Sequence, residues 1–214
     1  MKSSISHLRY EYSRQTLTET EMAADPVMQF EKWWKEALSA EVYEANAMVL
    51  ATAGTDGFPS ARIVLLKEFS MKGFVFFTNY NSFKGLQIAE NPKACLVFFW
   101  KELERQIRIT GIVNKISEEE NDAYFYSRPL QSQVGAVVSP QSHVIENRNW
   151  LDNNYIKLLA DAEKTPVQRP IYWGGYMVKP VIIEFWQGRP GRLHDRLQYS
   201  LANDGQWKIE RLAP

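Results

Sequence analysis

The sequence has few of the residues on which several common kinds of site depend. Among its 214 residues are one cysteine and three histidines, and no pair of them has the spacing of metal ligands. Because Cys95 is the single cysteine, an internal disulfide is excluded. It lies within the apolar run 94–100, which indicates a buried thiol in a reducing compartment. These absences argue against a catalytic zinc site, a nucleophilic cysteine and a disulfide-stabilised secreted domain.

The charges give no global preference for a polyanion. Lysine and arginine together number 25, as do aspartate and glutamate, so the formal net charge is zero and any anion binding must be local. The chain has no run of about 18 apolar residues and no charged-then-apolar start typical of a signal peptide. We therefore expect a cytoplasmic domain of ordinary size, with neither a membrane nor nucleic acid as a partner.

Three motifs that mark common nucleotide-binding and hydrolytic sites are also missing. There is no G-x-G-x-x-G, no G-x-x-x-x-G-K-[ST] and no G-x-S-x-G. The sequence therefore does not support a Rossmann dinucleotide site, a P-loop or the nucleophile elbow of a serine hydrolase.

The start of the chain predicts a polar tail followed by an amphipathic helix. Residues 1–24 have little apolar periodicity and are typical of a frayed terminus. Asp25 and Pro26 are suited to the N-cap and the first position of a helix, which we expect to pack against a sheet. Its predicted apolar face consists of Val27, Phe30, Trp33, Trp34, Ala37 and Leu38.

The rest of the chain shows short strand patterns interrupted by helices. The predicted strands are 48–52, 61–66, 74–78, 94–100, 105–115, 172–178, 181–187, 192–200 and 207–211. Helices are predicted at 82–89, up to 126 from an N-cap at Ser117, and over much of 130–165. This order predicts a mainly β, α+β protein, an antiparallel β-barrel with helical additions rather than a βαβ sheet.

The stretch Ile183–Arg196 concentrates chemistry in the second of two predicted strands. Alternation along a strand would place Arg192, His194 and Arg196 on one face, and Leu193, Leu197 and Tyr199 on the other. A row of cations is easiest to explain if an anion or an electron-rich ring lies across it, with Trp186 beside the ligand. The alternative is a solvated outer face of the sheet.

Two further stretches place cations where a phosphate could bind. Arg62 and Lys67 bracket an apolar run and, being five residues apart, would lie on opposite strand faces, so each could serve a different anion or one could be surface. Residues 78–84 put Thr78 and Lys84 at a strand-to-helix junction, where free backbone N–H groups favour a phosphate. An ordinary capped helix is the alternative.

A third set of donors is spaced by four residues. Tyr124, Arg128 and Ser132 would share one face if the backbone stayed helical, and they would suit a phosphate monoester, although Pro129 opposes that geometry. Gln106 and the Gln141-Ser142 pair offer amide and hydroxyl groups suited to the edge of a planar ring.

Together these stretches resemble the pyridoxine (pyridoxamine) 5′-phosphate oxidase family, flavoenzymes of the FMN-binding split-barrel fold. The resemblance covers nearly the whole chain, and E-F-W-Q-G followed by R-L-H-D-R is its most specific part. The other matching motifs, in order, are H-L-R-x-E-Y, R-I-V-L-L-K, F-T-N with S-x-K, E-R-Q, Y-x-x-S-R-P-x-x-S-Q-x-G, S-x-Q-S, Y-W-G-G-Y and W-x-I-x-R-L-A-P.

The resemblance implies an FMN site formed between the two subunits of a homodimer. Arg62 and Lys84 would hold the flavin phosphate, with hydrogen bonds from Thr78 and Ser142. The full set of implied cofactor contacts is Arg62, Ile63, Val64, Leu65, Leu66, Lys67, Phe77, Thr78, Lys84, Gln106, Gln141, Ser142, Trp186 and Arg196. One departure is Phe83, which stands where the family commonly has a second basic residue and which predicts weaker FMN retention.

The resemblance also implies the substrate and the reaction. Pyridoxine or pyridoxamine 5′-phosphate would be oxidised to pyridoxal 5′-phosphate with O₂ as acceptor, giving hydrogen peroxide, and ammonia from the amine. The substrate phosphate would be clamped by Lys67, Tyr124, Arg128 and Ser132. The implied catalytic residues are Arg192 and His194 at the pyridine ring, with Arg9 and Tyr12 closing over it. Residues 1–24 would then be a lid on a single domain, 25–214.

Two other functions remain open at this point. The same fold and FMN could serve a flavin reductase or another split-barrel oxidoreductase, although a complete phosphate clamp would then have no purpose. A non-catalytic carrier of pyridoxal 5′-phosphate is a third hypothesis, and persistent FMN with O₂ consumption would separate enzyme from carrier.

Overall fold

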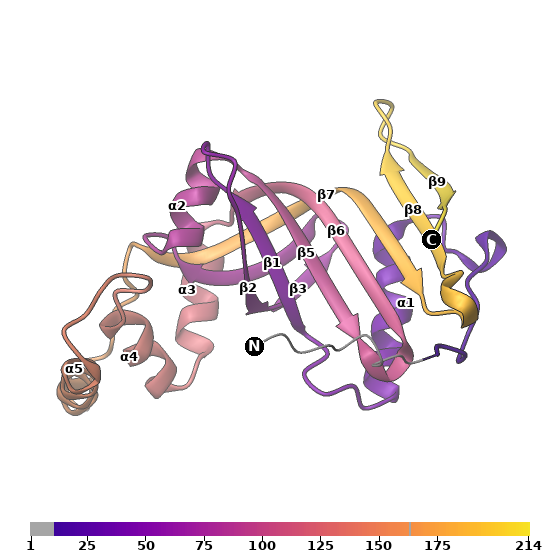
Figure 1. The fold of residues 1–214 in the computed structure, drawn as a ribbon. Coiled ribbons are helices and arrows are strands. Elements are labelled where there is room, and N and C mark those ends of the chain that lie inside the picture. Colours follow the sequence, from indigo (N-terminus) through magenta and orange to yellow (C-terminus); the bar gives the residue numbers. More distant parts are fainter. Residues whose placement is uncertain (1–10, 163) are drawn as a thin grey trace, which may run out of the picture. The chain divides into compact units, whose positions relative to one another are not determined.

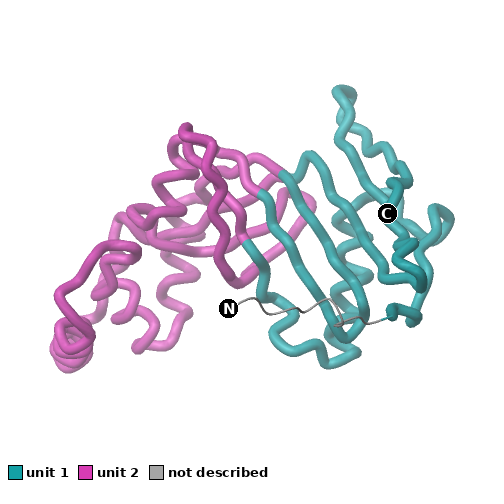
Figure 2. Tube along the Cα trace, in the orientation of Figure 1, with its two compact units in different colours: residues 1–49, 95–110, 180–214 teal, residues 50–94, 111–179 magenta. Residues whose placement is uncertain are grey.

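The computed structural model describes residues 11–162 and 164–214, which fall into two compact units. Within the described residues, unit 1 contains 11–49, 95–110 and 180–214, and unit 2 contains 50–94, 111–162 and 164–179. Figure 2 shows unit 1 in teal and unit 2 in magenta. The unit boundaries fall inside four strands, so these strands contribute residues to both units.

The described residues form a nine-stranded sheet (Figure 1). The pairs β3-β4, β4-β7, β7-β8 and β8-β9 are antiparallel, as the sequence predicted. The order is β2-β1-β5-β6-β7-β4-β3, with β8 paired to β7 and β9 to β8. The strands are β1 Ala47–Ala53, β2 Pro59–Leu65, β3 Glu68–Ser70, β4 Gly73–Asn79, β5 Lys93–Trp100, β6 Arg105–Lys115, β7 Trp173–Gln187, β8 Asp195–Leu201 and β9 Trp207–Leu212.

Strand β7 is continuous where the sequence predicted two strands. Residues 173–178 pair with β4, whereas residues 182–187 pair with β8. Pro180 lies between these two stretches, so neither pairing needs the N–H group that proline lacks. The proline therefore marks a change of partner rather than the end of a strand.

In unit 1, helix α1 (Pro26–Ser39) begins as predicted, because the Asp25 carboxylate accepts a hydrogen bond from Val27 N at 2.7 Å. The helix packs against the sheet through the rings of Phe30 and Trp33, which lie 5.3 Å from Phe98 and 5.1 Å from Phe185 between centroids. The predicted apolar face was wrong at Leu38, which is exposed because the buried stripe narrows toward the end of the helix.

In unit 2, four helices accompany the strands. They are α2 (Phe83–Glu90), α3 (Glu118–Ser127), α4 (Leu130–Val138) and α5 (Arg148–Ala162). Ser117 caps α3 as predicted, since its hydroxyl accepts from Glu120 N. A core of Phe125, Val134, Val167 and Trp173 fixes α3 and α4 against β7. Among the described residues, no helix has the length and apolar character required to span a bilayer.

Candidate active site

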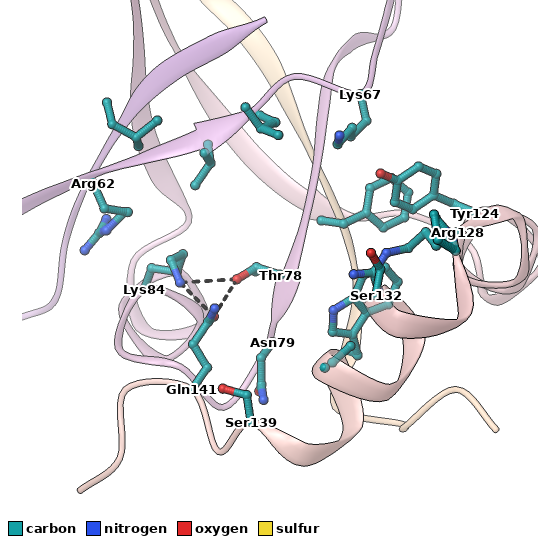
Figure 3. Close-up of a pocket in the computed structure, with 18 residues that line it drawn as sticks. Arg62, Lys67, Thr78, Asn79, Lys84, Tyr124, Arg128, Ser132, Ser139 and Gln141 are labelled. Atoms are coloured by element: carbon teal, nitrogen blue, oxygen red, sulfur yellow. Dashed lines mark hydrogen bonds between the residues drawn. The ribbon is translucent and has the colours of Figure 1, made fainter. Parts of the chain in front are cut away.

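Unit 2 contains a cavity of about 870 Å³ that gathers most of the predicted phosphate-binding residues. Figure 3 shows the side chains that line it. Four of the lining residues are cationic, Arg62, Lys67, Lys84 and Arg128, and none of those described here is aspartate or glutamate. The other lining residues are Ile63, Val64, Leu65, Phe77, Thr78, Asn79, Tyr124, Pro129, Ser132, Gly135, Ala136, Ser139, Gln141 and Trp173. Such a cavity is suited to anions.

One group of donors surrounds the ammonium of Lys84, where β4 gives way to α2. Lys84 Nζ donates to Gln141 Oε1 at 2.9 Å and lies 3.3 Å from Thr78 Oγ1, and Thr78 Oγ1 donates to Gln141 Oε1 at 3.0 Å (Figure 3). Arg62, on β2, donates to Thr52 Oγ1 at 2.6 Å and to Leu50 O at 3.2 Å. All of these partners are neutral.

The electrostatics of this group favour a bound anion. Burial, together with the smaller effect of the positive charge of Arg62, lowers the pKa of Lys84 to about 8. Burial also lowers the pKa of Arg62. Within the described residues neither side chain has a carboxylate partner, so an anion between them would relieve both the desolvation and the repulsion.

A second group lies at the junction of α3 and α4. Tyr124, Arg128 and Ser132 do not share one helical face, because α3 ends at Ser127 and Arg128 is extended, with ψ of 150°. The interruption expected at Pro129 is therefore present. The chain turns before α4 begins, and all three residues nevertheless line the cavity. The turn, rather than a continuous helical face, brings the three residues to the cavity.

Arg128 has an unused donor in this group. Its guanidinium carbon lies 4.6 Å from the Trp173 ring centroid, and burial lowers its pKa. Its Nη1 is buried and has no hydrogen-bond partner among the described residues. Tyr124 is held beside it by stacking on Phe77, with ring centroids 3.8 Å apart. A buried guanidinium N–H without a partner is expected where a ligand anion supplies the acceptor.

The strand that contributes Arg62 also brings Lys67 to the cavity. We predicted opposite faces for these two cations, but β2 ends at Leu65 and the alternation stops there, so both line the same cavity. Ile63, Val64 and Leu65 line it as well, whereas Leu66 is buried outside the lining.

Two polar residues that line the cavity were not predicted from the sequence, and a predicted hydroxyl of unit 2 lies outside its lining. Asn79 and Ser139 line it without having been singled out. Ser139 is the C-cap of α4, four residues beyond Gly135, and this spacing was the available signal. Ser142 lies instead on an exposed turn with φ of 72°, outside the lining.

Unit 1 brings together a different set of predicted residues, Trp186, His194 and Tyr12. The Trp186 and His194 rings are 4.6 Å apart, and Tyr12 meets the Trp186 ring edge-on at 5.6 Å. His194 Nδ1 accepts a hydrogen bond from Arg189 N at 3.1 Å. Burial and the charge of Arg192 lower the pKa of His194, which favours the neutral imidazole.

The segment that contains Tyr12 is held in place, so the predicted frayed terminus was wrong for its described part. The buried carboxylate of Glu104 accepts hydrogen bonds from Ser13 N and Arg14 N at 2.9 and 3.0 Å. Tyr12 packs directly on Gly188, where a Cβ atom would lie 2.6 Å from the tyrosine Cγ. Arg9, the other predicted lid residue, lies outside the described residues.

The predicted row of cations on one strand face was also wrong in part. Strand β8 begins only at Asp195, because Pro190–Arg192 form a 3-10 turn in which Arg192 adopts a left-handed φ of 62°. Arg192 is exposed on this turn and His194 follows it before the strand starts. Leu193, predicted to share a face with Leu197 and Tyr199, is 73% exposed, whereas those two residues are buried.

The remaining predicted cofactor residues of unit 1 lie on neighbouring elements. Arg196, on β8, donates to the buried Glu184 carboxylate at 2.9 and 3.2 Å and to Ala213 O at 2.7 Å. Gln106 is half-buried on β6. Arg196 is therefore a fixed guanidinium, in contrast to Arg192.

Comparisons with known proteins show the family to which the chain belongs. The family model described as pyridoxamine 5′-phosphate oxidase matches residues 34–157, and that described as the pyridoxine 5′-phosphate oxidase C-terminal dimerisation region matches residues 173–214. A pyridoxine/pyridoxamine 5′-phosphate oxidase from Trichormus variabilis is 53% identical over 214 residues, covering 100% of both chains.

Two solved structures are similar to this one. PhzG from Burkholderia lata 383, in complex with tetrahydrophenazine-1-carboxylic acid, has a TM-score of 0.89 and 30% identity over 94% of this chain and 100% of that one. A pyridoxamine 5′-phosphate oxidase-related, FMN binding protein from Nostoc punctiforme has a TM-score of 0.71 at 18% identity, over 90% and 100% of the two chains. The fold is the antiparallel split barrel of these proteins, and the chain belongs to the pyridoxine/pyridoxamine 5′-phosphate oxidase family.

Proposed function

We propose that the chain is an FMN-dependent oxidase that converts pyridoxine or pyridoxamine 5′-phosphate to pyridoxal 5′-phosphate in vitamin B6 biosynthesis and salvage. The observation that supports this most directly is the unit 2 cavity. It has two groups of cationic and hydrogen-bonding side chains suited to anions, and no carboxylate among the described residues that line it. One group suits the phosphate of the cofactor and the other the phosphate of the substrate. The full-length similarity to named oxidases of this kind supports the same conclusion.

The first group fits the phosphate of FMN. Arg62 and Lys84 would provide the charges, while Thr78 and Gln141 would provide hydrogen bonds. Bound FMN would accept two electrons from the substrate and return them to O₂, which becomes hydrogen peroxide. The protein would thus supply binding and orientation, beginning with two cations that are already in place.

The second group would fix the substrate by its phosphate. Arg128 has a buried donor ready for it, and Lys67, Tyr124 and Ser132 lie around the same part of the cavity. Holding the phosphate restricts the position of the pyridine ring and of C4′, the carbon that loses a hydride equivalent. The alcohol would give the aldehyde directly, and the amine would give it with uptake of water and release of ammonia.

The predicted catalytic residues of unit 1 would act at the pyridine ring of the substrate. Arg192 would orient the substrate, and the neutral imidazole of His194 would accept a proton, with Trp186 and Arg196 toward the flavin. The match of residues 173–214 to a dimerisation region supports a homodimer, and we place FMN at its subunit interface. Residues 1–24, with Arg9 and Tyr12, would close over the bound substrate as a lid on the domain formed by 25–214.

A visible spectrum under anaerobic conditions tests the proposal. The purified protein should show an oxidised flavin band that bleaches on addition of pyridoxine 5′-phosphate and returns when air is admitted. Pyridoxine without its phosphate is the matched control and should bleach the band far more slowly at the same concentration. A flavin band that does not bleach with the phosphorylated substrate would favour another split-barrel oxidoreductase. A protein that stays colourless after incubation with FMN would favour the carrier hypothesis.

A further inference from the structure

The guanidinium of Arg62 is held entirely by neutral acceptors. It donates to Leu50 O, to Thr52 Oγ1 and, at 2.5 Å, to Ser60 Oγ. Within the described residues it forms no ion pair with aspartate or glutamate. Its orientation is therefore fixed while its positive charge stays uncompensated.

Both hydroxyls that hold Arg62 are themselves bound by one atom. Thr52 Oγ1 and Ser60 Oγ each donate to Oε1 of Gln87, at 2.7 Å in both cases. Each hydroxyl has a single proton, so donating it to Gln87 leaves the oxygen lone pairs to accept from Arg62. Gln87, which is 5% exposed, thus sets the direction of the whole network.

The identity of residue 87 matters because a carboxylate could make the same two contacts. Glutamate has nearly the shape of glutamine and could accept both hydroxyl protons, but its negative charge would lie close to Arg62. Glutamine provides the acceptor without the charge. Gln87 also lies one turn after Lys84 on α2, so a single helix positions both cations of the group.

We propose that Gln87 is a positioning residue for the cofactor phosphate, acting through Thr52 and Ser60 to hold Arg62 in a binding orientation with its charge free. This inference rests on the proposed function, since it takes the Arg62 group to bind the phosphate of FMN. A role in packing alone would affect the whole cofactor and the fold equally. A role through Arg62 would affect only ligands that have the phosphate.

Titration of the apoprotein with FMN and with riboflavin, which lacks the phosphate, distinguishes these roles. Gln87→Met keeps the length of the side chain and removes the acceptor, and we expect it to raise the Kd for FMN about threefold to tenfold, the loss expected from one hydrogen bond. The Kd for riboflavin, measured by the same quenching of flavin fluorescence, should stay that of the parent. Gln29→Met is the matched control, because Gln29 is a buried glutamine of unit 1 whose side-chain oxygen accepts from Ala23 N.

Two further variants test the route of the effect. Gln87→Glu retains the acceptor and should still weaken FMN but not riboflavin, because it neutralises the charge of Arg62. In an Arg62→Ala background, Gln87→Met should cause no additional loss of FMN affinity. Equal effects on FMN and riboflavin, or an undiminished effect in the Arg62→Ala background, would overturn the positioning role. A parent protein that does not prefer FMN to riboflavin would overturn the phosphate assignment as well.

Discussion

The cations of the unit 2 cavity have neutral neighbours, whereas most guanidinium groups of unit 1 are paired with carboxylates. In the cavity, Lys84 is held by hydroxyl and amide oxygens, and Arg128 lies over an aromatic ring with one donor unused. In unit 1, the buried Glu184 binds the guanidinium groups of both Arg108 and Arg196. Arg211 likewise meets Glu19 and Asp195 at 2.8 Å.

This difference distinguishes charged residues that stabilise the fold from charged residues that are available to bind a ligand. A buried cation next to a carboxylate is compensated and has little reason to bind a further anion. A buried cation among neutral oxygens destabilises the fold until an anion arrives, and it then binds that anion strongly. The comparison therefore predicts that the cavity cations contribute to ligand binding and lower the stability of the apoprotein. The paired charges of unit 1 should instead raise that stability.

The largest effect is expected at Arg192, one of the arginines of unit 1 that is not paired with a carboxylate. It is exposed on a left-handed turn and has no carboxylate partner among the described residues, so it is free to contact the substrate as the proposed function assigns it. Arg192→Ala should lower turnover of pyridoxine 5′-phosphate by about a hundredfold or more, because loss of orientation alone has effects of that size. FMN content should not change.

The matched control for this prediction is a paired, exposed arginine. Arg148 lies on α5 and bridges to Asp152 at 2.8 Å, so Arg148→Ala should leave turnover unchanged. Steady-state peroxide production and the flavin spectrum of each variant provide the two readouts. Unchanged turnover in Arg192→Ala would show that an unpaired cation need not be functional.

Lys84→Met should have opposite effects on the cofactor and on the empty protein. Loss of a charged donor to the phosphate should raise the Kd for FMN about tenfold to a hundredfold. The apoprotein should instead become more stable at pH 7. Lowering the pKa of Lys84 from 10.5 to about 8 costs the fold at most about 3 kcal/mol while the lysine is protonated, and removing the lysine removes that cost.

The pH dependence of this stability difference has a definite sign. Because the pKa of Lys84 is lower in the folded than in the unfolded protein, the penalty is complete below pH 8 and disappears as the pH rises to 10.5. Urea unfolding of parent and Lys84→Met apoproteins should therefore differ most near pH 7 and converge above pH 10. A less stable variant at pH 7 would contradict the view that this cation strains the apoprotein.

Much of the fold could be predicted because it depends on local patterns. Alternation identified the strands, and Asp25 and Ser117 marked helix starts that the structure confirms. The three-residue β3 was too short to give a period, and the left-handed backbone of Arg192 is not visible in an alternation of residue types. The prediction therefore extended β8 across a turn.

The site was predictable to the extent that its residues lie in sequence motifs. The donors of the cavity lie together even where the chain leaves the helix, as at Arg128. The network behind Arg62 had no such signal, since Gln87 lies 35 residues from Thr52 and 27 from Ser60. Contacts of this kind depend on strand and helix packing that a single sequence does not specify.

Glu184→Gln should weaken the fold, the opposite of the result expected for Lys84→Met. The substitution would leave the guanidinium groups of Arg108 and Arg196 without their shared carboxylate. Because both arginines are partly exposed, we expect a loss of about 1–2 kcal/mol in the free energy of unfolding, less than for a fully buried pair. Urea unfolding at pH 7 measures it.

An exposed ion pair gives the control for Glu184. Glu210 bridges to Lys208 on the surface of β9, so Glu210→Gln should change the free energy of unfolding by less than about 0.5 kcal/mol. Equal effects of the two substitutions would mean that the Glu184 pairs contribute no more than surface pairs.

The smallest effect is expected at Phe83, which stands where a second basic residue beside Lys84 was expected. Phe83 is 56% exposed at the first position of α2, beside Lys84, so an arginine there could reach a phosphate held by Lys84 while remaining solvated. Phe83→Arg should therefore lower the Kd for FMN only about twofold to fivefold, the range of a solvated charge interaction.

This gain should disappear in high salt, because screening removes a solvated attraction and leaves buried ones. Phe83→Met is the control for loss of the ring, and riboflavin is the control for contacts other than the phosphate. The added charge also lies near Arg62 and Lys84 and at the positive end of α2, so the apoprotein should become slightly less stable as FMN binding strengthens. An FMN affinity that does not increase in titrations of the apoprotein would mean that Phe83 does not stand in place of a missing phosphate contact, and that two cations with neutral anchors are sufficient.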